Sequence, residues 1–338
     1  MEDLILSFIN PLPIIFLLGI IAVSLYTLSK GADLLIDEAV AVSSYLNVPK
    51  AIIGATIVSL GTTLPELSVS TMAAIQGSPD MALGNAVGSI ITNSGLIIGL
   101  AALLKPIDID RSSIKIQGWL KLLSAGMLIA FSLPFFSAGS EGTISQMMGF
   151  LFVAMLIAYL YWSFQESKRE SALSENKNDE VASKAEIIKK FLLMGVGMAI
   201  VILSSQVLIP TVEVTAIKLG VPKSIIAATL VAFGTSLPEL TTSIKAVLRG
   251  HGDLAVGNII GADILNVLFV IGVSAAVTPE GLLVPALFYR IHYPAMAVIL
   301  LTFRFVTLNK GNIIRRREGA ILMAFYMIYL GMNLTNFI

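Results

Sequence analysis

The sequence of 338 residues contains no cysteine, two histidines and few charged side chains, which make up 13% of the chain. Without cysteine it can form no disulfide, no thiolate metal site and no thiol nucleophile. His251 and His292 lie in no metal-ligand spacing, and no HExxH or Ser-His-Asp pattern occurs. A formal net charge of +0 offers no basic surface to nucleic acid. We therefore expect neither an enzyme nor a nucleic-acid-binding protein, and no bound cofactor.

Apolar residues are in excess, at 56% of the chain with a mean hydropathy of +0.88. Soluble domains contain about 45–50% apolar and about 25% charged residues. Because the excess extends over the whole chain, the sequence predicts an integral, multi-pass protein of the lipid bilayer. The N-terminal Met1-Glu2-Asp3 lacks the basic segment of a secretory signal, so we expect the first apolar stretch to remain as a helix.

Ten apolar windows are long enough to cross about 30 Å of hydrocarbon, which requires about 20 helical residues. They are residues 12–30, 50–76, 81–104, 117–136, 145–164, 190–209, 223–248, 254–277, 284–307 and 318–337. The sequence thus predicts an all-α membrane protein. Residues 165–186, rich in Ser, Glu, Lys and Asn, are predicted to form a flexible cytoplasmic linker between a first unit, 1–164, and a second unit, 187–338.

Lysine and arginine concentrate on one side of the predicted spans. With the N-terminus outside the cell, nineteen of the 22 Lys and Arg residues, Lys121 among them, fall at the inner ends. This distribution predicts a plasma-membrane protein with both termini outside.

The chain repeats itself with a shift of 173 positions. GTTLPEL at 61–67 corresponds to GTSLPEL at 234–240. Between 48–93 and 221–266 the alignment needs no gap, and 24 of 46 pairs are identical. Because each half holds five spans, an odd number, we expect the second copy to be inverted in the membrane. Inverted repeats are typical of transporters that bind substrate near the midplane.

The repeated motif predicts a break in two helices. Gly61 and Pro65 weaken the second span, and Gly234 and Pro238 weaken the seventh, because glycine costs helix stability and proline removes a backbone donor. Backbone left unpaired at membrane depth is tolerated only where it faces protein, water or an ion. The two breaks are therefore candidate ion sites.

A glutamate stands just after each break, Glu66 in the first copy and Glu239 in the second. Glu66 lies 16 residues beyond Lys50, about 24 Å of helix and so near the midplane. A charged side chain at that depth costs about 2.5–3.5 kcal/mol on insertion scales, so two glutamates without a basic partner in their motifs call for a cation. The available carboxylate, hydroxyl, amide and carbonyl oxygens suit hard cations such as calcium and sodium.

Other polar residues of the spans allow more than one interpretation. Asn93 and Asn266 lie midway along the third and eighth spans, and their alternative role is hydrogen bonding between helices. Five acidic residues are placed outside the site: Asp33, Asp37 and Glu38 on a solvated or interfacial face, and Asp263 and Glu213 without an assigned role.

The two motifs and the Gly-Asn-x-x-Gly segments at 84–88 and 257–261 resemble the alpha-repeats of the calcium:cation antiporter superfamily, most closely those of prokaryotic sodium/calcium exchangers. The proton-coupled branch typically has Gly-Asn-Ala-x-Glu-Leu around its acid, and this chain does not. The resemblance implies ten helices in two inverted five-helix repeats, with broken helices at the midplane around four cation positions. We also expect, partly from the resemblance, that the first and sixth spans slide as a gate across the other eight.

By motif match, the resemblance implies oxygen ligands for transported calcium and sodium: carboxylates of Glu66 and Glu239, carbonyls of Thr62 and Thr235, hydroxyls of Thr63, Ser236 and Ser89, backbone oxygens of Ser59 and Ala232, and the central amides of Asn93 and Asn266. The chain departs from the family pattern twice, with Asn266 in place of Asp and Ala262 in place of Ser. Two glutamates still balance one calcium ion, whereas the affinity and number of sodium ions are expected to change.

The leading interpretation is a monomeric secondary antiporter that exchanges calcium for sodium by alternating access. The alternative is exchange of calcium for protons, with the two glutamates titrating. The hydroxyl oxygens around the acids favour sodium, because protons do not need them. A passive cation channel is a third interpretation, but two proline-broken helices that close on one site do not form a wide pore.

Overall fold

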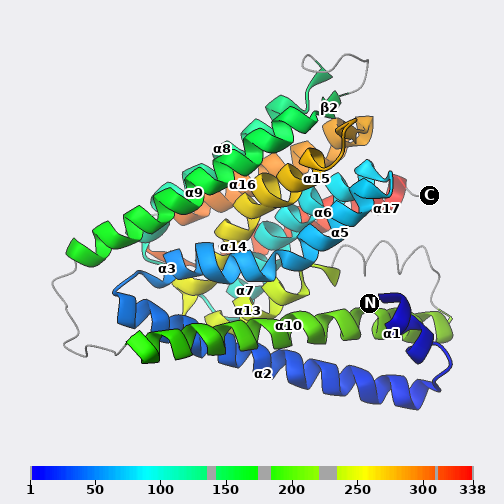
Figure 1. The fold of residues 1–338 in the computed structure, drawn as a ribbon, viewed down its shortest axis with the longest axis horizontal. Helices are drawn as coiled ribbons and strands as arrows, with labels where there is room; N and C mark the ends of the chain where they lie inside the picture. Colours follow the sequence, from blue (N-terminus) through cyan, green and yellow to red (C-terminus); the bar gives the residue numbers. More distant parts are fainter. Residues whose placement is uncertain (1, 135–141, 174–183, 221–233, 309–310, 337–338) are drawn as a thin grey trace.

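The computed structural model describes residues 2–134, 142–173, 184–220, 234–308 and 311–336, and nearly all of them are helical (Figure 1). The helices of the first half are α1 (Glu2–Ile9), α2 (Ile14–Leu46), α3 (Lys50–Ile53), α4 (Ser59–Thr62), α5 (Leu64–Ile75), α6 (Pro79–Ile91), α7 (Ile98–Leu104), α8 (Arg111–Phe131) and α9 (Gln146–Leu173). Those of the second half are α10 (Lys184–Lys218), α13 (Leu237–Leu248), α14 (Gly252–Leu265), α15 (Gly272–Ala276), α16 (Tyr293–Leu308) and α17 (Arg316–Asn336).

The described helices match the predicted spans in part. Among these residues seven helices are long and apolar enough to cross a membrane, or eight if the bent pair Lys50–Thr62 and Leu64–Ile75 is one span. The predicted span 223–248 begins outside the described residues, and the span 318–337 corresponds to α17. The fold is therefore that of a helical multi-pass membrane protein.

The predicted linker is partly helical. α9 continues to Leu173 and α10 begins at Lys184, while residues 174–183 lie outside the described part of the chain. Polar composition indicated a flexible segment here, but both neighbouring helices continue several residues into it.

The predicted helix break occurs in the first copy. α4 ends at Thr62 and α5 begins at Leu64, with a bend of 44° between the two segments. Pro65 lies in the first turn of α5, where its missing donor leaves no helical bond unmade. In the second copy α13 likewise has a proline in its first turn, and it begins and ends 173 positions after α5. The residues before Gly234 lie outside the description.

Wider helical turns interrupt the third and eighth predicted spans at matching places. π-helical segments η2 (Thr92–Ile97) and η5 (Asn266–Ile271) join α6 to α7 and α14 to α15. Two further π segments are η1 (Gly54–Val58), between α3 and α4, and η6 (Phe288–His292), before α16. Asn93 lies within η2 and Asn266 opens η5, so both amides sit where the regular helical ladder is disturbed.

Two short antiparallel strand pairs, which the all-α prediction did not include, tie loops of the two halves together. β1 (Ile107–Asp108) pairs with β4 (Ile313–Ile314), and β2 (Gly142–Ile144) pairs with β3 (Leu282–Val284).

The long helices α2 and α10 lie side by side along one face of the other helices (Figure 1). Small residues permit their close approach: a Cβ on Gly197 would lie 2.7 Å from the backbone nitrogen of Leu35. Leu28 and Val201 belong to an apolar cluster that is separate from the main core. Further along α2, Leu35 and its neighbours belong to the main core. The α2–α10 pair is thus packed mainly against itself along part of its length.

Close packing also joins the broken helix of the first copy to α14. A Cβ added to Gly257 would lie 2.2 Å from the carbonyl oxygen of Ala51, and one added to Gly261 would lie 2.4 Å from that of Ala55. Only glycine allows the two backbones this approach, as expected for small residues at helix crossings.

Candidate functional site

The two motif glutamates lie in the first turns of α5 and α13, and both side chains are buried. Their carboxylates are close enough to interact electrostatically. In each, the Oε2 atom has no hydrogen-bond partner within the described structure. Buried polar atoms are nearly always paired, so two free carboxylate oxygens indicate a place for a positively charged ligand.

Three more of the predicted ligands present a buried oxygen without a hydrogen-bond partner in the described residues: Thr63 Oγ1, Asn93 Oδ1 and Asn266 Oδ1. Thr63 occupies the bend between α4 and α5, and the two asparagines occupy η2 and η5. Carboxylate, amide and hydroxyl oxygens are the ligands that calcium and other hard cations take. The chemistry of the free atoms therefore fits such a cation.

The two copies contact each other through equivalent side chains. Thr62 Oγ1 lies 3.4 Å from Asn258 Oδ1, and Thr235 Oγ1 lies 3.1 Å from Asn85 Oδ1. Thr62 and Thr235 are 173 positions apart, as are Asn85 and Asn258. Each contact therefore joins a threonine of one copy to an asparagine of the other copy. This reciprocal pattern is the one that two-fold symmetry produces.

Three predicted ligands come together directly. Ser236 Oγ lies 3.1 Å from Ser89 Oγ and 3.5 Å from Glu66 Oε1. The first copy supplies Ser89 and Glu66, and the second supplies Ser236. The Thr62 hydroxyl lies beside Glu239, as that of its counterpart Thr235 lies beside Glu66. Each carboxylate is thus bordered by hydroxyls from the opposite copy.

The remaining predicted ligands differ in how they are placed. Ser59 is buried and its hydroxyl donates to the carbonyl of Thr56 at 3.2 Å. A Cβ on Gly261 would lie 2.5 Å from Ser59 Oγ, so Ser59 packs against α14 one residue before Ala262. Ala232 lies outside the described residues.

Sequence reasoning missed three polar residues beside Asn93. Asp263 Oδ1 accepts from Asn93 Nδ2 at 3.0 Å, Asp263 Oδ2 accepts from Ser94 Oγ at 2.7 Å, and Lys121 Nζ lies 2.8 Å from Oδ2. The placement of Lys121 at an inner membrane end was wrong, because it is buried at the middle of α8. The available signal was a charged residue within the predicted span 117–136, since charged residues inside spans usually mark function.

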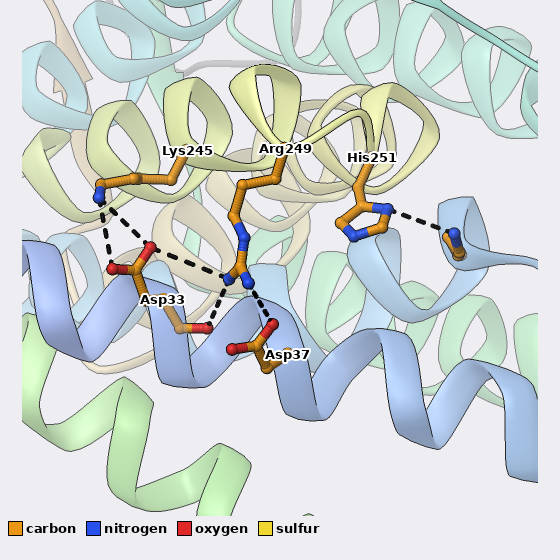
Figure 2. Close-up of polar contacts among 6 residues, drawn as sticks. Asp33, Asp37, Lys245, Arg249 and His251 are labelled. Carbon is orange, nitrogen blue, oxygen red and sulfur yellow. Dashed lines mark hydrogen bonds and ion pairs between the residues drawn. The ribbon is translucent and has the colours of Figure 1, made fainter.

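A second polar cluster joins α2 to the C-terminal end of α13 (Figure 2). Asp33 lies 3.3 Å from Lys245 Nζ and 3.9 Å from Arg249 Nη1, and Asp37 lies 2.6 Å from Arg249 Nη2. His251 Nδ1 lies 3.3 Å from Lys50 Nζ. The part of α2 expected to form a solvated or interfacial face therefore takes part in a partly exposed ion-pair contact between helices.

Glu38 corrects the same expectation more strongly. Its side chain is buried and lies 3.0 Å from Lys190 Nζ of α10. Composition alone placed Glu38 with its acidic neighbours, whereas the packing of α2 on α10 gives it a separate partner.

Within the described residues no three His, Cys, Asp or Glu side chains gather as metal ligands. A cation at the centre would therefore rely on two carboxylates supplemented by amides, hydroxyls and backbone carbonyls. Such a set gives loose, oxygen-rich coordination, which suits an ion that must also leave.

Two carboxylates at the meeting of the two copies of a repeated helix motif in a membrane fold define a secondary cation transporter. The sodium/calcium exchanger protein family matches residues 16–165 and 189–335 of the chain. The chain belongs to this family.

Individual relatives agree over nearly their full lengths. The sodium/calcium exchanger MaX1 of Methanosarcina acetivorans is 30% identical, over 92% of this chain and 96% of its own. The inner membrane protein YrbG of Escherichia coli is 31% identical, over 93% and 95%. A solved structure of the sodium-calcium exchanger NCX_Mj, soaked with sodium and without calcium, superposes with a TM-score of 0.77 at 27% identity, covering 94% of this chain and 99% of that one.

Proposed function

We propose that this protein exchanges calcium for sodium across the membrane by alternating access. The observation that carries the proposal is the pair of buried glutamates, Glu66 and Glu239, each with one carboxylate oxygen free of any hydrogen-bond partner in the described structure. Two carboxylates neutralise one calcium ion. The names of MaX1 and NCX_Mj, both sodium/calcium exchangers, support the same pair of ions.

Sodium is favoured over protons by the surroundings of the carboxylates. Ser236, which contacts Ser89, borders Glu66, and Thr62 borders Glu239. A sodium ion that sheds water needs such oxygens, because each lost water contact must be replaced. The remaining ligands are those of the predicted set, with the free amide oxygens of Asn93 and Asn266 at the centre.

The proposed topology has ten spans in two inverted five-helix repeats, with both termini outside the plasma membrane, in a monomer. The reciprocal contacts of Thr62 with Asn258 and of Thr235 with Asn85 support a two-fold relation between the repeats. The excess of Lys and Arg on one side supports the orientation.

The α2–α10 pair is the proposed moving part. These helices carry none of the proposed ion ligands and have an apolar cluster of their own. Sliding of this pair would expose the site alternately to the two sides while the ion-binding oxygens stay almost still, in keeping with rigid-body motion in inverted-repeat carriers.

The test is radioactive calcium uptake by proteoliposomes under an outward sodium gradient, with and without a membrane potential. Sodium should drive uptake, and an inside-negative or inside-positive potential should alter it if the charges exchanged are unequal, since each net charge contributes about 2.3 kcal/mol per 100 mV. Uptake that ignores sodium and follows a pH gradient would replace the sodium proposal with proton exchange. Calcium flux down its own gradient, in the absence of both a sodium gradient and a pH gradient, would indicate a channel.

A further inference from the structure

Asp263 differs from the two site glutamates in being saturated with donors. Its carboxylate receives the Asn93 amide, the Ser94 hydroxyl and the Lys121 ammonium, at 3.0, 2.7 and 2.8 Å. Within the described residues, Glu66 and Glu239 each keep one carboxylate oxygen without a hydrogen-bond partner. Of the three central acids, Asp263 is therefore already paired with groups of the protein, whereas the two glutamates remain available to a cation.

The Lys121 ammonium is held as a bound cation would be. Its nitrogen lies 2.8 Å from Asp263 Oδ2 and 2.5 Å from Ser94 Oγ, and 3.8 Å from the centre of the Phe303 ring. Two oxygens and an aromatic face surround it, and both charged side chains are at most 2% exposed. Burying these charges is tolerated because they are paired and hydrogen-bonded.

The fold of the repeated unit does not require this pair. The position equivalent to Asp263 in the first copy is Ile90, so the acid occurs in one copy only. The other site elements, including the glutamates, the Gly-Thr-x-Leu-Pro motifs and the central asparagines, occur in both. Because the ion pair occurs in one copy only, it changes the charge of the site and is not needed to build the repeated fold.

The pair also fixes the orientation of a proposed ligand. Asn93 donates its Nδ2 to Asp263, so its Oδ1, which lacks a partner in the described structure, is left for an ion. Without Asp263 the amide would be free to turn and present its donor group instead.

We propose that Lys121 is a built-in cation that holds the place beside Asp263 which a transported monovalent cation would otherwise take, and so limits the binding charge to Glu66 and Glu239. This inference rests on the proposed function. Three carboxylates and one ammonium leave a net charge of minus two, which one calcium ion neutralises. Removal of the ammonium alone leaves minus three, and the additional charge recruits sodium or potassium.

The test compares Lys121→Met, Asp263→Asn and the double variant, with Lys115→Met as the control, because Lys115 is an exposed lysine of the same helix. Lys121→Met should require an additional monovalent cation both to bind calcium and to exchange it. The charge moved per calcium ion, taken from the reversal potential, should change by one. Asp263→Asn leaves an unpaired ammonium and should weaken calcium binding at least tenfold. The double variant restores minus two and should recover binding to within about threefold, less than 1 kcal/mol.

Calcium binding is measured by calorimetry in detergent as well as by flux, so that the two proposals fail separately. Loss of sodium-driven flux in the wild type overturns the exchange function, while the calorimetric pattern still tests Lys121. Lys121→Met with wild-type charge per calcium and no added cation dependence overturns the built-in cation. If a single variant does not fold, the double variant decides: a loss of calcium affinity of tenfold or more overturns the proposal.

Discussion

Arg249 Nη2 lies 2.6 Å from Asp37 Oδ1, and this ion pair joins α13, the helix that carries Glu239, to α2 of the proposed moving pair (Figure 2). A small cavity of about 10 Å³ lies between α2, α13 and α14, and Leu35, Ala39 and Ser243 are among its lining residues. The ion pairs therefore join α2 to the end of α13, and the cavity lies between α2 and the site-bearing helices.

Loosening this contact should open that end more often. The variant Asp33→Asn/Asp37→Asn removes the carboxylates that hold Lys245 and Arg249. The chain lacks cysteine, so a single Ser243→Cys probe can report access to the cavity. We expect thiol labelling of the probe in membranes to become several-fold faster. The exposed Asp80→Asn serves as the control, and an equal labelling rate in both would show that the ion pairs do not restrain α2.

The second prediction concerns the two carboxylates. Glu66→Gln and Glu239→Gln each remove one of the two charges that balance calcium, so each should reduce calcium exchange to background. Neutral glutamine fills the same volume, and the proteins should still fold with unchanged elution in size-exclusion chromatography. Exposed Glu280→Gln should keep wild-type flux. Near-normal flux in either site variant would refute the two-glutamate site.

The third prediction uses the departures from the family pattern. Ala262→Ser/Asn266→Asp supplies a hydroxyl and a carboxylate, and should lower the sodium concentration for half-maximal calcium efflux several-fold. The reason is that sodium must exchange water for protein oxygens, and a methyl group offers none. A half-maximal concentration that stays equal or rises would show that position 262 does not face the ion path.

The fourth prediction concerns packing under the site. Gly257→Ala or Gly261→Ala would force a methyl group against the backbone of the first copy, at 2.2 Å from Ala51 O or 2.4 Å from Ala55 O. Such overpacking costs about 1–3 kcal/mol. Both variants should unfold at lower temperature in detergent than the wild type. Gly126→Ala, which meets nothing within 4 Å, should not, and equal melting temperatures in all three would contradict the close approach.

The fifth prediction is a pH dependence at His251, which precedes α14 and contacts Lys50 of α3. Burial lowers the pKa of His251, the charges of Lys50, Arg249 and Lys105 lower it further, and Asp37 opposes them. An unfolded histidine has a pKa of about 6.5, so the unfolded chain takes up the proton first. The stabilisation by neutral His251 is therefore complete above about pH 6.5 and is lost as the pH falls towards the lower folded pKa.

Thermal unfolding from neutral to mildly acidic pH checks this dependence. The melting temperature of the wild type should fall more steeply than that of His251→Gln, which has no proton to accept. Parallel curves for the two proteins would show that His251 does not contribute.

Much of the site could be predicted because its residues lie close together in the sequence, within each copy of the repeated motif. The break at Thr63 follows from a local run of glycine, threonine and proline, and α13 repeats α5 because their sequences repeat. The burial of Glu66 and Glu239 follows from their depth within long apolar spans. Each of these inferences needs only neighbouring residues and the hydrophobic thickness of a bilayer.

The charged partners could not be predicted in the same way. The sequence predicts Lys121 at an inner membrane end and Glu38 on a solvated or interfacial face, and it assigns no role to Asp263. Their partners come from other helices, and hydropathy does not specify which faces of two helices meet. The same holds for the oxygens of Asn93 and Asn266, which have no hydrogen-bond partner among the described residues because of what packs around them.

The sequence by itself determined the membrane class, the duplicated motif, the helix break in the first copy and the two acids, because backbone rules and hydropathy act locally along the chain. Only the tertiary structure decided that Lys121 neutralises Asp263, that Arg249 holds Asp37, and that each carboxylate borders hydroxyls of the opposite copy. These contacts join residues more than a hundred positions apart, and they depend on how each helix is rotated when the helices pack.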